Sequence, residues 1–502
     1  MMSHSKIKKI YGPPGTGKTH RLMHYLDEEL KKTDPKKIVY IAFGNAAVDV
    51  AKERIKNDDV YVSTMHAMGR KECDLNTKTS LLKGNKWKGF KNFSRICSDL
   101  SFESAIDHNG YVQYVNPHMK VMEYARNKKI SLEEAAVQLD LHHSIDIFLT
   151  QQIKTDLDTY KEDTGMFEYA DMISKFVEGD KCPPLHCVFL DEAQDLSPLQ
   201  WDMFFYIESK CARSYIAGDD DQTIYTFQGA DPKIFINLKG TFDSQTQSRR
   251  IPRAVHRIAS SILPHMSERM EKEWLPRDEE GEVHHNIQFE DIDFSKGSWL
   301  VLTRTNKMLE SLRDHLYRMN YRFEAKSQEL LPNKMLSAYK VWKRLNDGAY
   351  VSKDDVKDLW DFLTVKDGHL ERGYAGGKTL QNITSVNLEG LRAEHGLRAT
   401  GSWETLNFPE DSKLYIKKLL ESGDDLMKPA RIKLSTIHRV KGDEADNVVL
   451  FTDIERIIYD SAKRDADPEH RTFYVGTTRA KQKLFITNQG YEYQYNIGAP
   501  VI

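Results

Sequence analysis

The sequence predicts an α/β fold built on a parallel sheet, and three observations carry that prediction. A β-prone run, 7–11, leads into a Gly/Pro-rich turn and then a helical pattern. The runs CVFL (187–190) and SYIAGD (214–219) lack the polar alternation of a half-exposed strand, which favours strands buried on both faces. Strands near 37–43 and 60–65 alternate with a helix near 46–57. Such alternation predicts parallel strands covered by helices on both sides.

Composition and charge limit the classes of protein to which the chain can belong. The chain has 502 residues, of which 40% are hydrophobic and 29% are charged, and its net charge is −3. The length predicts about three or four domains, and any positive charge that serves nucleic acid must be local. The N-terminal residues lack the apolar region of a signal peptide, and no run of about 18 apolar residues occurs. We therefore expect a cytoplasmic protein without membrane contact.

The five cysteines are scattered and do not predict a metal site. Cys182 and Cys187 flank His186, but their spacing differs from that of zinc-binding pairs and no second pair follows. Buried or loop thiols in a reducing compartment are the expectation.

The turn after the first strand fits the phosphate-binding pattern G-x-x-x-x-G-K-T. Glycines let backbone N–H groups close around phosphates, and the start of a helix adds positive potential. Lys18 would supply charge to the outer phosphates, and the Thr19 hydroxyl would ligate magnesium. The predicted nucleotide-binding residues are Gly12, Pro13, Pro14, Gly15, Thr16, Gly17, Lys18 and Thr19.

An acid pair follows the apolar run 187–190, where the carboxyl end of a strand is expected. Asp191 at that tip can hold magnesium. Glu192 can act as general base, because a water that attacks the γ-phosphate needs a proton acceptor.

Nine segments continue this pattern in a fixed order between residue 12 and about residue 481. They are YGPPGTGKT, IAFGNAAVDVAKERI, VSTMHAMG, LDEAQDLSPLQ, GDDDQTIYTFQGAD, SRRIPRAV, WLVLTRTN, LSTIHRVKGDEADNVVLF and FYVGTTRAK. In composition and order they resemble the motifs of superfamily 1 helicases of the UvrD/Rep/PcrA type.

The resemblance implies two RecA-like parallel-sheet cores with ATP and Mg²⁺ in the cleft between them. The first core would comprise 1–66 and 181–240, and the second 241–330 and 429–502. Each would carry a mostly helical insertion, at 67–180 and, in reduced form, at 331–428. No appended nuclease domain is expected.

The resemblance also assigns residues to the nucleotide. Gln222 matches the γ-phosphate sensor, and Arg250 and Arg479 match arginines that reach the γ-phosphate from the second core. Glu444 matches a residue near the ribose. Arg249 occupies the place of a tyrosine that stacks on adenine, and a shift of one residue would make Arg249 the phosphate-binding arginine instead. The family's adenine-reading glutamine segment before the phosphate loop is absent from the eleven residues before Gly12.

By the same resemblance, these motifs imply a binding surface for single-stranded DNA. Base stacking on aromatic rings contributes about 1–3 kcal/mol per base at such surfaces. The implied DNA-binding residues are Phe43, Asn45, Thr64, His66, Tyr225, Phe227, Thr436 and His438.

The DNA-facing motif departs from the family at two positions. Phe227 replaces the usual tryptophan and Gln228 the usual arginine, which predicts a weaker grip on DNA. The three acids Asp219 to Asp221 have no clustered histidine, so we expect them to cap and shape this loop instead of binding a metal.

One patch stands outside the motifs. Residues 83–95, KGNKWKGFKNFSR, hold five basic residues, no acidic ones, and three aromatic rings. Basic residues interleaved with aromatics suit a nucleic-acid backbone. A solvated loop pinned by buried aromatics explains the pattern equally well.

The sequence thus predicts an ATP-driven 3′–5′ translocase that moves on single-stranded DNA and unwinds duplexes at single-strand/duplex junctions. We expect a monomeric or weakly self-associating protein. The polarity comes from the resemblance alone. Two alternatives remain: a translocase that displaces proteins with little unwinding of its own, and an ATP-binding switch or scaffold without DNA-stimulated ATPase.

Overall fold

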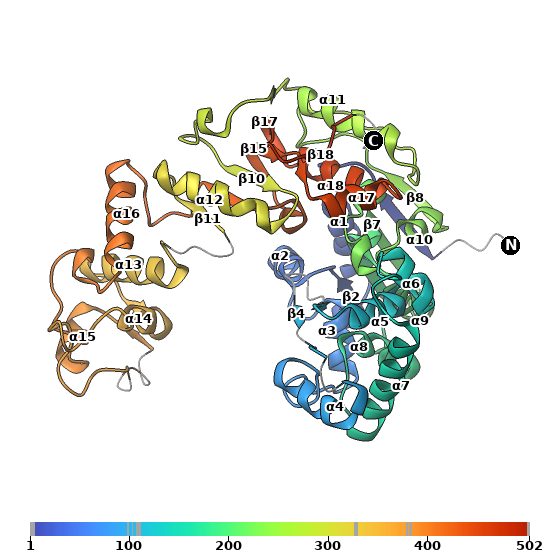
Figure 1. Cartoon of the computed structure of the whole chain (residues 1–502), viewed down its shortest axis with the longest axis horizontal. Helices are drawn as coiled ribbons and strands as arrows, with labels where there is room; N and C mark the ends of the chain where they lie inside the picture. Colours follow the sequence, from blue (N-terminus) through green and yellow to red (C-terminus); the bar gives the residue numbers. More distant parts are fainter. Residues whose placement is uncertain are drawn as a thin grey trace.

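The structure is a computed structural model that describes residues 6–97, 100–102, 104–106, 112–325, 330–377, 380 and 384–498. Two six-stranded sheets dominate these residues, and every strand pair in both is parallel (Figure 1). The predicted α/β fold class is therefore confirmed.

The first sheet has the strand order β3-β2-β6-β7-β1-β8. In that order the strands span Tyr61–Ser63, Ile38–Ile41, Cys187–Leu190, Arg213–Gly218, Ile7–Tyr11 and Thr241–Ser244. Two of its interior strands, β2 and β6, are buried at every residue, as their apolar sequences require.

Helices cover both faces of this sheet. Helices α1 (Lys18–Leu30) and α2 (Asn45–Ile55) pack on one face through Leu22, Leu26 and Val48. Helices α8 (Tyr169–Glu178) and α9 (Pro198–Lys210) cover the other face with a second apolar cluster.

The second sheet has the strand order β11-β14-β10-β15-β17-β9. In that order the strands span Phe323–Glu324, Ile432–Thr436, Trp299–Thr303, Ala445–Phe451, Ala480–Thr487 and Glu282–His285. Helices α11 (Arg253–Ile262), α12 (Leu309–Arg318) and α18 (Asp467–Thr477) pack on it.

The expected boundary between the cores at 240/241 is wrong by several residues. Strand β8 pairs in parallel with β1, from Lys8–Thr241 to Tyr11–Ser244, so the first core continues to Ser244. The sequence signal was weak because β8, TFDS, is a partly exposed strand at the sheet edge.

Both insertions have cores of their own. Between β3 and β6 lie α3 (Met65–Glu72), α4 (Trp87–Phe93), α5 (Pro117–Lys128), α6 (Leu132–Gln138), α7 (Ile147–Thr164) and α8, and α4 to α7 form the core of the insertion. Helices α3 and α8 pack in the apolar cluster of the first sheet instead, so the expected insertion bounds 67–180 are too wide at both ends. Between β11 and β14 lie α13 (Asn333–Asn346), α14 (Lys353–Trp360), α15 (Leu388–Glu394) and α16 (Glu410–Glu421), which form the arm at the left of Figure 1.

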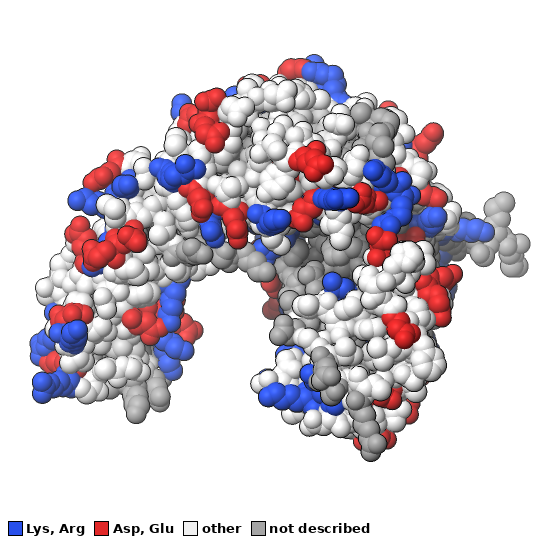
Figure 2. All heavy atoms as spheres, in the orientation of Figure 1, with Lys and Arg blue, Asp and Glu red and all other residues white. Residues whose placement is uncertain are grey.

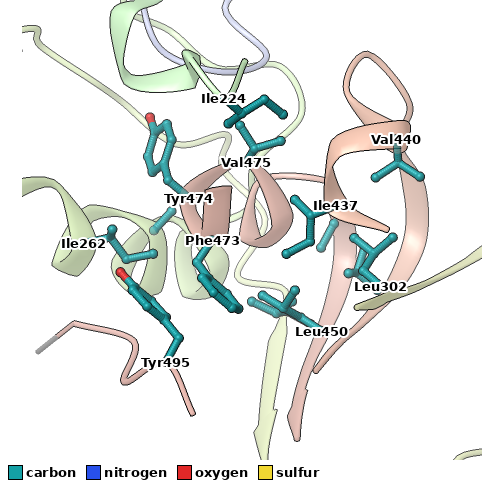
Figure 3. Packing of buried hydrophobic residues seen from close by; sticks show 14 of the residues in the cluster. Ile224, Ile262, Leu302, Ile437, Val440, Leu450, Phe473, Tyr474, Val475 and Tyr495 are labelled. Atoms are coloured by element: carbon teal, nitrogen blue, oxygen red, sulfur yellow. The ribbon is translucent and has the colours of Figure 1, made fainter. Parts of the chain in front are cut away.

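The two cores share an apolar contact. Ile224 of the first core belongs to the same buried cluster as Val475 and Tyr474 of α18, and Figure 3 shows Ile224 directly beside Val475. The two cores are therefore joined by packed apolar side chains as well as by polar contacts.

The surface in Figure 2 carries positive and negative side chains intermixed, and the molecule has an arch shape with an opening between the arm and the first insertion. Among the described residues, no helix is both long and apolar enough to cross a membrane.

Candidate nucleotide cleft and nucleic-acid interface

The loop predicted to bind phosphate lies between β1 and α1, where the sequence places it. Gly15 and Gly17 have φ values of 75° and 88°, a backbone conformation that side chains other than glycine adopt with strain. Lys18 Nζ donates to the carbonyl oxygens of Gly12 (2.8 Å) and Pro13 (3.1 Å), and Thr16 Oγ1 donates to Pro13 (2.8 Å). The loop thus forms a compact cradle at the N-terminus of α1, where an anion is favoured.

The acid pair lies at the tip of β6, directly opposite this helix. Thr19 Oγ1 donates to Asp191 Oδ2 at 2.9 Å, and the Tyr40 hydroxyl donates to the same oxygen at 3.1 Å. Burial and the charge of Glu192 raise the pKa of Asp191 to about 6. A half-buried carboxylate beside a hydroxyl is a set of hard oxygen ligands, so the residues present fit Mg²⁺.

Glu192 follows with a left-handed backbone, φ 53°, and accepts a hydrogen bond from Gln194 Nε2 at 2.6 Å. Burial opposes its charge, but the cations Lys441 and Lys18 prevail and lower its pKa. The carboxylate is therefore ionised at neutral pH and can accept a proton.

The second core contributes cations to the same cleft. Arg479, two residues after the end of α18, donates from Nη2 to Gln222 Oε1 at 2.9 Å. Burial, together with the nearby positive charge of Arg250, lowers the pKa of Arg479 to about 9. Burial and a nearby positive charge both disfavour the charged form of this guanidinium, so any anion that enters the cleft stabilises it.

Arg250 and Arg249 have different environments. Arg250 Nε lies 2.5 Å from Glu444 Oε2, and Glu444 also pairs with Lys481 at 2.7 Å. Arg249 is exposed, and its backbone N–H donates to Gly15 at 2.8 Å. Both arginines, Glu444, the acid pair and Gln222 line one cleft of about 1020 Å³.

Four of the predicted DNA-binding residues form an aromatic cluster next to Gln222. Ring centroids of Phe43 and Tyr225 lie 5.1 Å apart, those of Tyr225 and Phe227 6.2 Å, and those of Phe227 and His438 5.5 Å. Phe227 is 48% exposed. It therefore presents an apolar surface that a base could stack on.

Tyr225 does not present a stacking face, contrary to the prediction. It is only 3% exposed, because Phe43 stacks on its ring and Lys441 lies 5.4 Å from the ring centroid. Its hydroxyl donates to the His438 carbonyl at 3.1 Å, so the side chain joins the two cores.

Of the other four predicted DNA-binding residues, only Asn45 is exposed to solvent. Thr64 is buried and its hydroxyl caps α3 by accepting from Ala67 N at 3.2 Å. Thr436 is buried at the end of β14. Burial lowers the pKa of His66 to about 4. Asn45 is exposed at the first residue of α2.

Family models match most of the elements that build this cleft. The UvrD/REP helicase N-terminal domain matches residues 2–243, and the UvrD-like helicase C-terminal domain matches residues 403–490. The chain belongs to the UvrD/REP helicase family.

Individual relatives of this UvrD-family chain are distant. ATP-dependent DNA helicase PcrA of Leuconostoc citreum is 21% identical over 390 residues, which cover 68% of this chain and 50% of the relative. PcrA of Staphylococcus aureus is 20% identical and covers 72% and 52%. A probable DNA helicase of Mycoplasma pneumoniae is 20% identical over 97% of this chain and 81% of its own length. The chain spans about half the length of the PcrA relatives.

Among solved structures, the arterivirus nonstructural protein 10 helicase aligns with a TM-score of 0.35 and 10% identity, covering 97% of this chain and 60% of that one. The complex of the same viral helicase with DNA aligns with a TM-score of 0.33 and 10% identity, covering 97% and 61%.

Sequence reasoning missed Lys441, which connects the cores of this UvrD-family chain. Its Nζ donates to the Gln222 carbonyl at 2.6 Å and also pairs with buried Asp195. The lysine lies inside the motif LSTIHRVKGDEADNVVLF, but nothing in the local sequence indicates a partner more than 200 residues away.

The first insertion also contacts the loop that carries Phe227. Asn127 Nδ2, near the end of α5, donates to the Gln228 carbonyl at 3.3 Å, and Lys128 pairs with Asp231 at 3.1 Å. A Cβ on Gly229 would lie 2.9 Å from the Asn127 Cβ, so only glycine allows this approach.

The basic patch at 83–95 divides into two sets. Trp87 and Phe90 are buried in the core of the first insertion, whereas Phe93 is 42% exposed, and Lys83 and Lys88 are exposed as well. The side chain of Arg95 lies outside the described residues. Two of the three rings thus serve packing.

Proposed function

We propose that this chain is an ATP-dependent 3′–5′ DNA helicase or translocase that acts in the cytoplasm as a monomer or weakly self-associating protein. One observation carries the proposal: Gln222 bonds Arg479 of the second core and lies in the same loop as exposed Phe227. A nucleotide in the cleft would contact Gln222, and a DNA base on the surface would contact Phe227. Both ligands would thereby shift the same loop. The relatives named ATP-dependent DNA helicase support this assignment.

The nucleotide would be bound by the cradle and hydrolysed beside the acid pair. Backbone N–H groups at the start of α1 would hold the phosphates, with Lys18 moving from its carbonyl partners to the outer phosphates. Thr19 and Asp191 would hold Mg²⁺, which would neutralise phosphate charge when bound. Glu192 would accept the proton of the attacking water.

Closure of the two cores would complete the site. Arg479 and Arg250 are both cations of the second core that face the first, and Arg250 would exchange Glu444 for phosphate. Cations supplied across a cleft stabilise the charge that develops during phosphoryl transfer, typically by several orders of magnitude in rate. Catalysis would therefore depend on the closed arrangement.

Stepping along DNA would follow from the same closure. Phe227 would stack on a base of a single strand, at a junction with duplex or elsewhere, with His438 of the second core beside it. A change in the distance between the cores would alter this pocket, so that bases are released and gripped in phase with ATP turnover.

A second candidate, a translocase that displaces proteins with little unwinding, is favoured by the departures at 227 and 228. Phe227 offers a smaller face than tryptophan, and Gln228 supplies no charge to a phosphate. Both changes weaken attachment to DNA at this position.

The test uses matched DNA and RNA duplexes that carry a single-stranded tail on either the 3′ or the 5′ end. We expect DNA-stimulated ATP hydrolysis and unwinding of the 3′-tailed DNA duplex. Translocation without unwinding would favour the second candidate. Unwinding only from 5′ tails would refute the polarity, and ATP binding without DNA-stimulated hydrolysis would favour the switch or scaffold.

The Glu192→Gln variant serves as the inactive control in each assay, because it keeps the shape of the side chain and removes the proton acceptor.

A further inference from the structure

Residues 267–274 of the second core, which we name the crossing segment, lie against the first core. The segment follows α11 and precedes β9. At its start, the backbone N–H groups of Ser267 and Glu268 donate to Asp467 at 2.8 and 3.1 Å, which anchors it to α18. Its later residues bond the three consecutive aspartates of the first core. The segment therefore joins the two cores outside the nucleotide cleft.

Lys272 of the crossing segment is surrounded by these aspartates. Its Nζ lies 2.8 Å from Asp219 Oδ1, 2.6 Å from Asp220 Oδ1 and 2.8 Å from Asp221 Oδ2. An ammonium has three N–H donors, so each aspartate can receive one. Its side chain is 1% exposed, and the three aspartates are completely buried.

The charges in this buried cluster are balanced. Arg269 forms a bidentate contact with Asp221, with both distances 3.0 Å. Buried Lys9 interacts electrostatically with Asp220. Burial opposes the charge of Lys272, but the three carboxylates prevail and raise its pKa. Such groups stay buried only while each charge has partners.

The cluster continues into the nucleotide site through Asp219. The second oxygen of this carboxylate, Oδ2, accepts from Gln222 Nε2 at 2.6 Å. The Gln222 amide can then direct only its oxygen, Oε1, toward Arg479 Nη2, where the distance is 2.9 Å. The reverse orientation would place two donors against each other at Arg479 and two acceptors at Asp219.

We propose that Lys272 is a positioning residue for the nucleotide site: by holding Asp219 it fixes the amide of Gln222 toward Arg479. The inference rests on the proposed function and deepens it, because it assigns the orientation of the γ-phosphate sensor to a residue of the other core. Withdrawal of the crossing segment would release Asp219, and the Gln222 amide would lose its fixed orientation.

Two variants separate positioning from charge balance. Lys272→Met removes the ammonium and leaves a buried net negative charge, so this variant can lose stability for that reason alone. Lys272→Met combined with Asp220→Asn restores the balance. The amide oxygen of the new side chain can still accept from Met270 N, which donates to Asp220 at 2.7 Å. Neither change touches Gln222.

Lys233→Met is the matched control. Lys233 also links the first core to the crossing segment, through Glu268 at 3.1 Å, but its side chain is 58% exposed. The same chemical change there removes a bridge between the cores without affecting Asp219.

Thermal midpoints, kcat and KM for ATP with saturating single-stranded DNA, and hydrogen exchange of the nucleotide-free protein are measured for all four proteins. We expect the double variant to regain most of the thermal midpoint that Lys272→Met loses. Its kcat should remain at least about tenfold below wild type, with KM changed less than about threefold, as for an interaction made in the transition state. Lys233→Met should match wild type.

The proposal is overturned if the double variant recovers the wild-type kcat, which would make the cluster a structural brace only. It is also overturned if the loss appears in KM with kcat unchanged. If the wild-type chain hydrolyses no ATP, the proposed function fails, and hydrogen exchange decides the inference by itself. Faster exchange over residues 219–223 in the double variant than in wild type supports positioning, and equal exchange refutes it.

Discussion

Phe227→Ala is the change that best distinguishes a loss of DNA binding from a loss of folding stability. Phe227 is 48% exposed, so about half of the ring is covered by neighbours such as Tyr225 and His438. Truncation of a fully buried phenylalanine costs about 3–5 kcal/mol, so we expect a loss of about 2 kcal/mol in unfolding free energy here. The protein should remain folded.

The expected loss in DNA binding is separate from this cost. One stacked base contributes about 1–3 kcal/mol, which corresponds to a Kd for single-stranded DNA that rises about 5- to 150-fold. Fluorescence anisotropy of a labelled oligo-dT measures the Kd, and the DNA concentration that half-stimulates ATPase gives a second value. ATP affinity in the absence of DNA should stay unchanged.

Phe205→Ala is the matched control. Phe205 of α9 is 38% exposed and stacks on Trp201 at 5.4 Å, so the change removes a similarly half-covered ring away from the cleft. If Phe227→Ala leaves both DNA measurements within about twofold of wild type, as Phe205→Ala should, the assignment of Phe227 to base stacking is wrong.

Three further changes test other parts of the molecule. Glu192→Gln should keep ATP binding and lower turnover by about 10²–10⁴-fold, and near-normal turnover would remove Glu192 as the general base. Arg479→Ala should lower kcat by about 10³-fold or more while the protein still binds ATP, and a change in ATP affinity alone would contradict its role at the γ-phosphate. Glu168→Gln should destabilise the first insertion by about 3 kcal/mol at neutral pH, because Arg126 (2.8 Å) and Lys161 (3.0 Å) overcome burial and hold the Glu168 pKa at about 2. Since that pKa is depressed, the difference in thermal midpoint should close as pH falls from about 4.5 towards about 2, and a constant difference would refute the linkage.

The elements that the sequence predicted well are those determined by local chemistry. The strand, glycine turn and helix around Lys18 are encoded within about 25 residues, and the apolar run before Asp191 requires a buried strand whatever surrounds it. The same holds for α2, expected near 46–57 and observed at Asn45–Ile55. Their order along the chain then sets the sheet topology.

The parts that escaped prediction depend on distant partners. Three adjacent aspartates indicated a shaped loop, but the cation that contacts all three, Lys272, is about 50 residues away in an irregular segment. Tyr225 has the composition of a stacking residue, and only the packing of Phe43 against it shows that its ring is covered. Exposure is a property of the assembled cores, and local sequence does not encode it.

The buried cluster also limits how this protein can be divided into fragments. Two of the cations that face Asp219 to Asp221, Lys272 and Arg269, belong to the second core. A fragment cut after β8 would contain the whole first sheet but would lack both cations and the crossing segment that covers these carboxylates, so three adjacent negative charges would lose their partners. The boundary recognised by the N-terminal family model, residue 243, thus marks a unit of sequence similarity. We therefore expect the first core to need the crossing segment for full stability, so that the two halves of the chain acquire their stability together.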